Sequence, residues 1–314
     1  MGPPGTGIST NCSGSRRTAE QRSRSTIPVY YIIKTLGDSV AMMMPLTTSV
    51  APTPPGAIFF GGGAWACAYS LGAAVHLRRK FRHLPDIPIG GVSSGAIVAL
   101  AYILARSDEE MVSMFDAMSE LARIYGTTGT MSLYIHLTLD RVLPIHGTDG
   151  TEYQRLNGGR FSVGITRFPC RPALICEWKS NQHVHDVIHT SVHVPIYCTY
   201  QPTFLAVDGG LSRAFWDISR SGNTIYISPL LQKAHIHPRK SISWSDIIWP
   251  STVDRRHDLF EQGGRDAEEY LASPTRPRPA RGAIRSLVLW LLRNIVSLGA
   301  WPVVAICRML RWST

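Results

Sequence analysis

The sequence predicts an α/β layer fold built around a largely parallel sheet. Short apolar strands alternate with helical segments along the middle of the chain, and glycine-rich turns connect several of them. The composition also suits a folded protein, because 44% of the 314 residues are hydrophobic and only 17% are charged. A chain with this balance buries a normal core and is not disordered along its whole length.

The predicted elements begin with an apolar strand that is followed by three glycines. A helix with a basic end comes next, and a second apolar strand ends in a turn that contains two serines. An apolar helix follows, and then an amphipathic helix whose first three residues are acidic and complement the helix dipole. Two strands paired around a Pro/Cys turn, a helix and two more strands complete the pattern. The ranges are 57–60, 65–82, 87–92, 96–104, 108–124, 160–166, 173–178, 183–193, 203–207 and 224–228.

Composition divides the chain into four regions. Residues 1–56 are rich in Ser, Thr, Pro and Gly, and we expect a disordered or weakly structured leader. Residues 57–272 hold the predicted strands and helices. Residues 273–281 form a Pro/Arg linker, and residues 282–314 form an apolar tail studded with arginine.

The tail at 282–314 has the pattern of an amphipathic helix. At about 100° per residue, its polar side chains occupy about half of the helical wheel and its tryptophans lie near the boundary. Because Arg293 interrupts the apolar run, we expect an anchor in the plane of a membrane or lipid-droplet surface rather than a transmembrane span. A core or oligomer helix is the alternative. The residues concerned are Arg285, Arg293, Arg308, Arg311, Trp290, Trp301 and Trp312.

The net charge of +10, from 32 basic and 22 acidic residues, favours anionic partners such as nucleic acid or an anionic membrane. Nucleic acid is not expected, because the sequence has no RNP pattern, zinc finger or helix-turn-helix signature. The six cysteines show no C-x-x-C spacing, and residues 1–26 lack the apolar region of a secretory signal. We therefore expect an intracellular protein with reduced cysteines that associates with a membrane or lipid droplet.

The pentapeptide Gly91-Val92-Ser93-Ser94-Gly95 is a G-x-S-x-G placed between a predicted strand and a predicted helix. A serine nucleophile needs this arrangement, because a sharp turn exposes its hydroxyl and only small flanking residues let the turn close. The following helix directs its free N–H groups at a developing oxyanion. A glycine-rich turn without catalysis is the alternative for this motif.

Gly61-Gly62-Gly63 also lies between a predicted strand and a predicted helix. Backbone N–H groups in such a loop approach a ligand without interference from Cβ atoms, as an oxyanion hole or a phosphate cradle requires. A P-loop is excluded because the G-K-[ST] ending is missing, and no G-x-G-x-x-G fits the segment.

Asp208-Gly209-Gly210 follows the apolar strand predicted at 203–207. A lone D-G-G is usually a turn. This D-G-G becomes a candidate site only together with the other two motifs, because the ends of parallel strands converge on one crevice at the same edge of a sheet.

In this order, the three motifs resemble those of the patatin-like phospholipases. The resemblance implies a three-layer α/β/α sandwich with a largely parallel central sheet and a Ser–Asp dyad without a catalytic histidine. It implies Ser93 as the nucleophile, Asp208 as its base and the N–H groups of Gly61, Gly62 and Gly63 as oxyanion donors. Gly91 and Gly95 would form the nucleophile elbow.

The resemblance extends to the adiponutrin and adipose triglyceride lipase branch, and it covers roughly residues 57–272. Segment 58–79, with Tyr69 and Gly72, resembles the opening strand and helix of that branch. Segment 190–195 resembles its A-S-x-x-x-P stretch, and segment 258–271 resembles its closing helix.

The chain departs from the family in the glycine loop, where Ala64-Trp65-Ala66 follows the third glycine. Aligning the chain on Tyr69 and Gly72 makes Gly62 the first glycine of the loop and places Ala64 where the family has glycine. An alanine there still donates its N–H unless the position requires a positive φ. The departure puts catalytic efficiency in question more than it does the fold.

Histidines offer two further interpretations. His185, His189 and His193 share one face of a predicted helix, close to His183, and convergent imidazoles are what a zinc ion needs. No glutamate lies between them as in H-E-x-x-H, so a polar helix face or core histidines are expected and no metal or cofactor is predicted. A Ser–His–Asp triad through His235 or His237 is the alternative to the dyad.

The predicted function is that of a serine lipid acyl hydrolase, which cleaves fatty-acyl esters of phospholipids or acylglycerols through an acyl-enzyme. The alternative is a catalytically weak or inactive protein of the same fold that acts at lipid surfaces. The expected partners are a lipid ester and a membrane or droplet surface bound through the tail. The sequence leaves the head group and any protein co-activator open.

Overall fold

The computed structural model describes residues 55–84, 86–145, 150–167, 171–194, 198, 206–212 and 223–274. Most of the predicted leader and linker and all of the predicted tail at 282–314 lie outside these residues. Nothing in the described residues therefore bears on the predicted membrane anchor.

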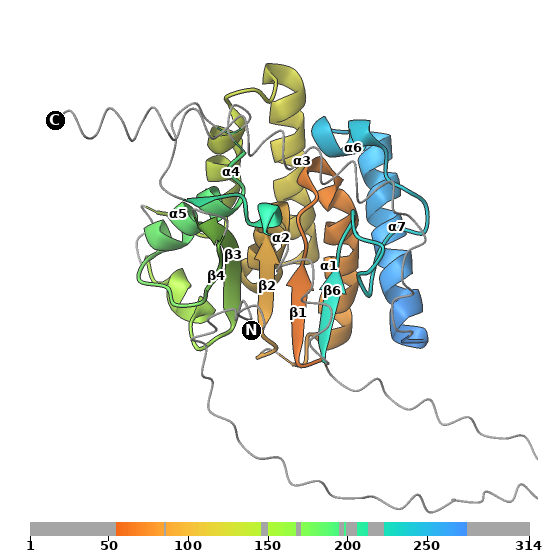
Figure 1. Cartoon of the computed structure of the whole chain (residues 1–314), viewed down its shortest axis with the longest axis horizontal. Helices are drawn as coiled ribbons and strands as arrows, with labels where there is room; N and C mark the ends of the chain where they lie inside the picture. The colour runs from red at the N-terminus through yellow and green to blue at the C-terminus, as the bar shows by residue number, and fades with distance from the viewer. Residues whose placement is uncertain are drawn as a thin grey trace, which may run out of the picture.

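A six-stranded sheet forms the centre of the described fold (Figure 1). Its strands run in the order β4-β3-β2-β1-β6, and β5 pairs with β3 beside that path. Strands β6, β1, β2 and β3 are parallel, whereas β4 and β5 are antiparallel to β3. Helices flank the sheet, so the predicted α/β fold with a largely parallel sheet is confirmed. The strands are β1 (Ala57–Phe60), β2 (Ile89–Val92), β3 (Phe161–Arg167), β4 (Arg171–Ile175), β5 (Ala206–Val207) and β6 (Thr224–Ile227).

The helices follow the predicted pattern, except that α4 and α6 were not predicted from the sequence. Helix α3 shows why most helices could be predicted, because its buried apolar side chains recur at helical spacing. They are Met111, Met114, Phe115 and Met118. Ser107 caps that helix by accepting a hydrogen bond from the Glu110 N–H at 3.1 Å. The helices are α1 (Cys67–Phe81), α2 (Ser94–Leu104), α3 (Asp108–Tyr125), α4 (Met131–Asp140), α5 (Asn181–Ser191), α6 (Trp244–Ile248) and α7 (Val253–Ala272), with 3₁₀ turns η1 (Ala64–Ala66), η2 (Glu152–Leu156) and η3 (Gly209–Leu211).

Helix α2 runs through the middle of the core and is buried on almost every side. This burial suits its composition, because a helix that is apolar all round has no face for water. Helix α7 packs along α1, where the Tyr69 hydroxyl donates to the Asp266 carboxylate at 2.8 Å. The core therefore fixes the start of α2, which is the position of the G-x-S-x-G turn.

The structure also bears on the cysteines and on membrane-spanning helices. Cys67 and Cys198 are free and buried, but Cys176 is disulfide-bonded, so the expectation that all cysteines are reduced is wrong for Cys176. Among the described residues, no helix combines the length and the apolar character that crossing a membrane requires.

Candidate active site

Ser93 lies between the end of β2 and the start of α2, in a strained backbone conformation. Its φ of 56° and ψ of −137° are disfavoured for any residue with a side chain. Such strain persists only where the surroundings fix the chain, as the paired strand β2 and the buried helix α2 do here. The turn has the strand–turn–helix form in which a serine hydroxyl is exposed at the edge of a sheet.

The two glycines of the pentapeptide are required by close backbone contacts. A Cβ atom on Gly91 would lie 2.3 Å from the carbonyl oxygen of Gly95. A Cβ atom on Gly95 would lie 2.3 Å from the carbonyl oxygen of Phe60, at the end of β1. Both distances are far below van der Waals contact, so the turn closes against β1 only with glycine at these positions.

Asp208 lies against Ser93, and the Ser93 hydroxyl donates to its Oδ2 atom at 2.6 Å. The other carboxylate oxygen accepts the Gly210 N–H at 2.6 Å. We expected Asp208 to follow a strand parallel to the others. Instead, the strand before it, β5, is antiparallel to β3. Asp208 therefore approaches the carboxyl edge of the sheet from the opposite direction, folded back over the end of β3.

Burial changes the acidity of the Asp208 side chain. Removal from water raises its pKa to about 6, and the hydrogen bonds from Ser93 and Gly210 oppose that rise. A carboxylate with a pKa close to neutrality is a stronger base than an ordinary aspartate and is still ionised at pH 7. The arrangement can therefore accept the proton of a serine nucleophile.

Ser191 holds the turn at Ser93 in place, a role that the sequence did not reveal. Its hydroxyl donates to the carbonyl of Gly164 in β3 at 2.7 Å and accepts the Ser93 N–H at 2.9 Å. Ser191 is fully buried at the end of α5. Its position in the segment that resembles the A-S-x-x-x-P stretch was the one signal that singled it out.

The glycine loop offers fewer free donors than the three glycines suggested. The Gly61 N–H donates to Ile227 in β6 at 2.8 Å, and the Gly63 N–H donates to the Ser94 hydroxyl at 3.1 Å. Within the part of the chain that the structure describes, the N–H groups of Gly62 and Ala64 have no acceptor. Gly62 also faces Ser93, since a Cβ atom on it would lie 2.9 Å from the Cβ of Ser93.

Ala64 occupies a backbone conformation that favours glycine. Its φ is 46°, and only Ser93 shares a positive φ among the described residues other than glycine. The alignment on Tyr69 and Gly72 had placed Ala64 at a glycine position of the family. The backbone thus keeps the conformation that a glycine would adopt, at a cost in strain.

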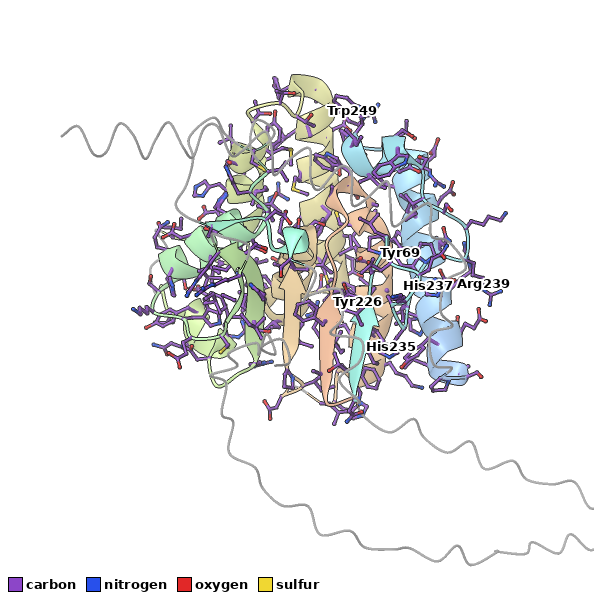
Figure 2. All side chains as sticks on the ribbon, in the orientation of Figure 1. Tyr69, Tyr226, His235, His237, Arg239 and Trp249 are labelled. Atoms are coloured by element: carbon purple, nitrogen blue, oxygen red, sulfur yellow. The ribbon has the colours of Figure 1, made fainter. Side chains whose placement is uncertain are left out.

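In the described part of the chain, neither histidine of the alternative triad is hydrogen-bonded to Ser93 or Asp208. The Nδ1 atom of His235 accepts the Tyr226 N–H at 3.0 Å, and its ring lies beside Tyr270. His237 lies near α7, away from the turn after β2 (Figure 2). Across the described residues, no histidine ring is hydrogen-bonded to Ser93 or Asp208. The geometry favours the two-residue arrangement over the triad.

Comparisons with known proteins identify the family of the chain. Residues 58–215, half of the chain, match the family described as patatin-like phospholipase. The chain belongs to the patatin-like phospholipase family. The matched residues include most of β1, the glycine loop, Ser93, Ser191 and Asp208.

Among solved structures, the fold has a weak similarity to the crystal structure of the type III effector protein ExoU. The identity is 14% and the TM-score 0.38, with 70% of this chain and 53% of that chain covered. This chain therefore spans about half the length of that protein. The search of curated proteins finds no match.

Proposed function

We propose that this protein is a serine lipid acyl hydrolase in which Ser93 and Asp208 form the catalytic dyad. The 2.6 Å hydrogen bond from the Ser93 hydroxyl to a buried carboxylate is the observation that carries the proposal. It joins a partly buried serine hydroxyl to a base with a raised pKa, which is the pairing that activates a hydroxyl. Membership of the patatin-like phospholipase family supports the same class of reaction.

In the first half of the reaction, Asp208 accepts the Ser93 proton while the serine oxygen attacks the carbonyl carbon of a lipid ester. The tetrahedral intermediate carries its negative charge on the former carbonyl oxygen. We assign the stabilisation of that oxyanion to the free N–H groups of Gly62 and Ala64, aided by the positive end of α2. Collapse of the intermediate expels the alcohol, which takes the proton from Asp208, and leaves an acyl-Ser93 ester.

In the second half, Asp208 is ionised again and accepts a proton from a water molecule. The resulting hydroxide attacks the acyl-Ser93 carbonyl, and a second tetrahedral intermediate uses the same N–H donors. Release of the fatty acid returns the proton from Asp208 to Ser93. The cycle consumes water and ester and needs no metal or cofactor.

The surface beside the glycine loop suits a lipid interface. Helix α6 packs against η1, which contains Ala64, and lies at the end of the molecule toward which β1 and β2 point (Figure 1). Trp249 and Val253 expose 57% and 58% of their surface there, and Trp244 exposes 43%. Tryptophan favours the boundary between hydrocarbon and water, so we assign this surface to contact with a membrane or lipid droplet.

The substrate and the location that we propose rest on the resemblance to the adiponutrin and adipose triglyceride lipase branch. The substrate would be a phospholipid or acylglycerol, and the protein would associate with a membrane or lipid droplet inside the cell. Residues 57–272 would form the catalytic domain, and the tail at 282–314 would add a second membrane contact.

A second candidate is a weak or inactive member of the family that binds lipid surfaces, and the strained backbone at Ala64 is the observation that raises it. Fatty-acid release from phosphatidylcholine and triacylglycerol emulsions separates the two. Wild type should release fatty acid and react with a serine-directed fluorophosphonate, whereas Ser93→Ala and Asp208→Asn should lose release. The exposed pair Ser113→Ala and Asp258→Asn serves as the matched control and should keep it. Droplet binding without release or labelling in wild type would establish the second candidate.

A further inference from the structure

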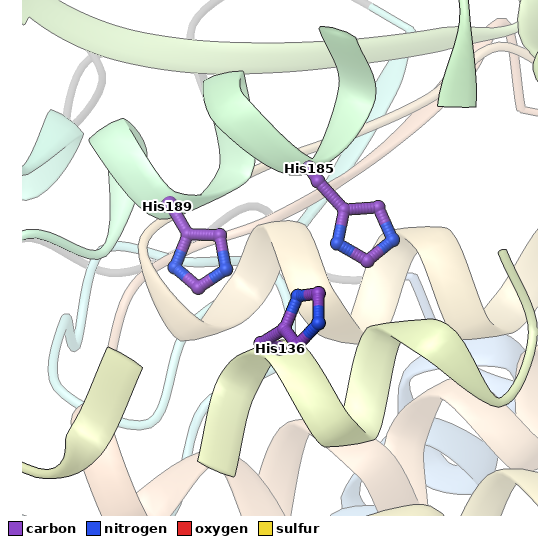
Figure 3. Close-up of side chains that lie close together, drawn as sticks. All are labelled: His136, His185 and His189. Atoms are coloured by element: carbon purple, nitrogen blue, oxygen red, sulfur yellow. The ribbon is translucent and has the colours of Figure 1, made fainter. Parts of the chain in front are cut away.

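Three histidine side chains from two helices come together (Figure 3), and Figure 1 shows these helices, α4 and α5, at the opposite end of the molecule from α7. His136 comes from α4, whereas His185 and His189 lie one turn apart on α5. Their rings are neighbours, with centroids 5.4 Å apart for His136 and His185 and 6.3 Å apart for His136 and His189. One nitrogen from each ring lies within 4.8 Å of the other two.

His185 is buried in a way that leaves one nitrogen without a partner. Its Nε2 atom lies 2.7 Å from the carbonyl oxygen of Leu143, which can only accept a hydrogen bond, so Nε2 carries the ring proton. The Nδ1 atom then carries a lone pair. Only 1% of the His185 surface is exposed, and Nδ1 is buried without a hydrogen-bond partner in the described structure.

An unsatisfied lone pair in such a position is unusual, because burying a polar atom without a partner is unfavourable. The same geometry is what a metal-binding histidine adopts. Such a histidine donates one ring nitrogen to a backbone carbonyl, which fixes the tautomer and directs the other nitrogen at the ion. In Figure 3 one ring nitrogen of His185 faces the space between the three rings.

We propose that His136, His185 and His189 bind a zinc ion. Three imidazoles with no carboxylate among them suit zinc and exclude calcium and magnesium, which prefer oxygen ligands. His136 and His189 are partly exposed, so solvent can supply the fourth ligand of a tetrahedral site. Imidazole nitrogens on one zinc ion lie about 3.3 Å apart, so zinc binding requires the rings to move inward from the present arrangement, in which one nitrogen of each ring lies within 4.8 Å of the other two.

The predicted set of histidines differs from this site in one member. The sequence placed His185, His189 and His193 on one helical face, but His193 follows the end of α5 and is not part of the cluster. The third member is His136 on α4, a helix that was not predicted from the sequence. The ion would tie α4 to α5, and α5 ends at Ser191, which holds the N–H of Ser93.

The test is zinc binding by the untagged, full-length chain after its metals have been stripped with a chelator. Zinc is titrated in competition with a chromophoric chelator, and His136→Gln and His189→Gln are compared with wild type. Each variant should lose at least about 100-fold in affinity for one zinc equivalent, since even the partners of metal ligands contribute 10- to 100-fold. His183→Gln is the matched control on α5, because its ring packs on Trp178 outside the cluster. It should bind as wild type does.

Equal stoichiometry and affinity in all four proteins would overturn the proposal, as would an equal loss in His183→Gln. A second measurement needs no variant. Cobalt(II) added to the metal-free wild type should give the intense visible absorption of a tetrahedral ion and should be displaced by zinc. Weak octahedral absorption, or no cobalt uptake at all, would refute the site. Both readouts are independent of ester hydrolysis, so they do not depend on the proposed function.

Discussion

The buried carboxylate of Asp208 links the proposed chemistry to folding stability, and the substitution Asp208→Asn should make that link measurable. Burial raises the pKa of Asp208 from its ordinary value of 3.8 to about 6 in the folded protein. Ionisation is therefore less favourable in the native state than in the unfolded chain. The stability that follows from the raised pKa is fully present below about pH 4 and is lost as the pH rises through about 6.

The magnitude follows from the size of the pKa difference. Each pKa unit corresponds to about 1.4 kcal/mol, so ionisation of Asp208 destabilises the folded protein by about 3 kcal/mol at pH 8. Asparagine has no such ionisation, and its amide oxygen can still accept the Gly210 N–H that now reaches Asp208 at 2.6 Å. The variant should gain stability over wild type by about 2 kcal/mol between pH 4.5 and pH 8.

The assay is urea unfolding followed by tryptophan fluorescence at several pH values across this range. Asp258→Asn, at an exposed site on α7, is the control for replacing an aspartate by asparagine. Turnover should be lost in Asp208→Asn at every pH. A stability difference that is constant with pH, or that favours wild type at pH 8, would refute the account of Asp208 as a desolvated base.

The remaining predictions concern the dyad and its surroundings. The kcat/KM of wild type for a water-soluble ester should rise with pH through about 6, because only ionised Asp208 accepts the serine proton; a flat profile between pH 5 and 7 would exclude it as the base. Gly62→Ala should lower kcat by about 100-fold or more while the far-UV spectrum stays native, because its Cβ would collide with Ser93 and displace an oxyanion donor. Ala64→Gly should stabilise the protein by about 0.5 kcal/mol in urea unfolding without lowering kcat, since glycine removes the strain of a positive φ but loses more entropy on folding. Ser191→Ala should destabilise the fold by about 2 kcal/mol and lower kcat more than KM rises, because it leaves the Ser93 N–H without its acceptor; unchanged kcat in a folded variant would show that Ser191 does not position the nucleophile.

The fold could be predicted from the sequence, as could Ser93 and Asp208 as residues that lie together, because their signals are local. The pentapeptide around Ser93 lies between an apolar strand and an apolar helix, and the observed β2 and α2 lie within two residues of the predicted ranges. The close backbone contacts of the turn require glycine at fixed positions within a few residues, so they produce a sequence motif that predicts the turn. The parallel order of β1 and β2 follows from the helix that connects them.

The rest of the site depends on contacts between distant segments. A loop N–H is free only if no distant acceptor binds it. The Gly61 N–H donates to the carbonyl of Ile227, which lies more than 160 residues further along the chain. The reversed direction of β5 also gave no local signal, because two residues carry no periodicity. His136 was missed for the same reason, since only the packing of α4 against α5 shows that it faces His185.

The departure at Ala64 bears most on the choice between an active enzyme and an inactive lipid-binding protein. A residue with a side chain in a left-handed conformation destabilises the fold by about 1–2 kcal/mol. That penalty belongs to folding, because the direction of the N–H depends on the backbone dihedrals and not on the side chain. Loss of an oxyanion donor, by contrast, would raise the reaction barrier by about 3–4 kcal/mol. The backbone at Ala64 keeps its positive φ and its N–H has no acceptor among the described residues, so the substitution lowers stability while leaving the donor in place. An N–H donor that stays in place favours catalysis over inactivity.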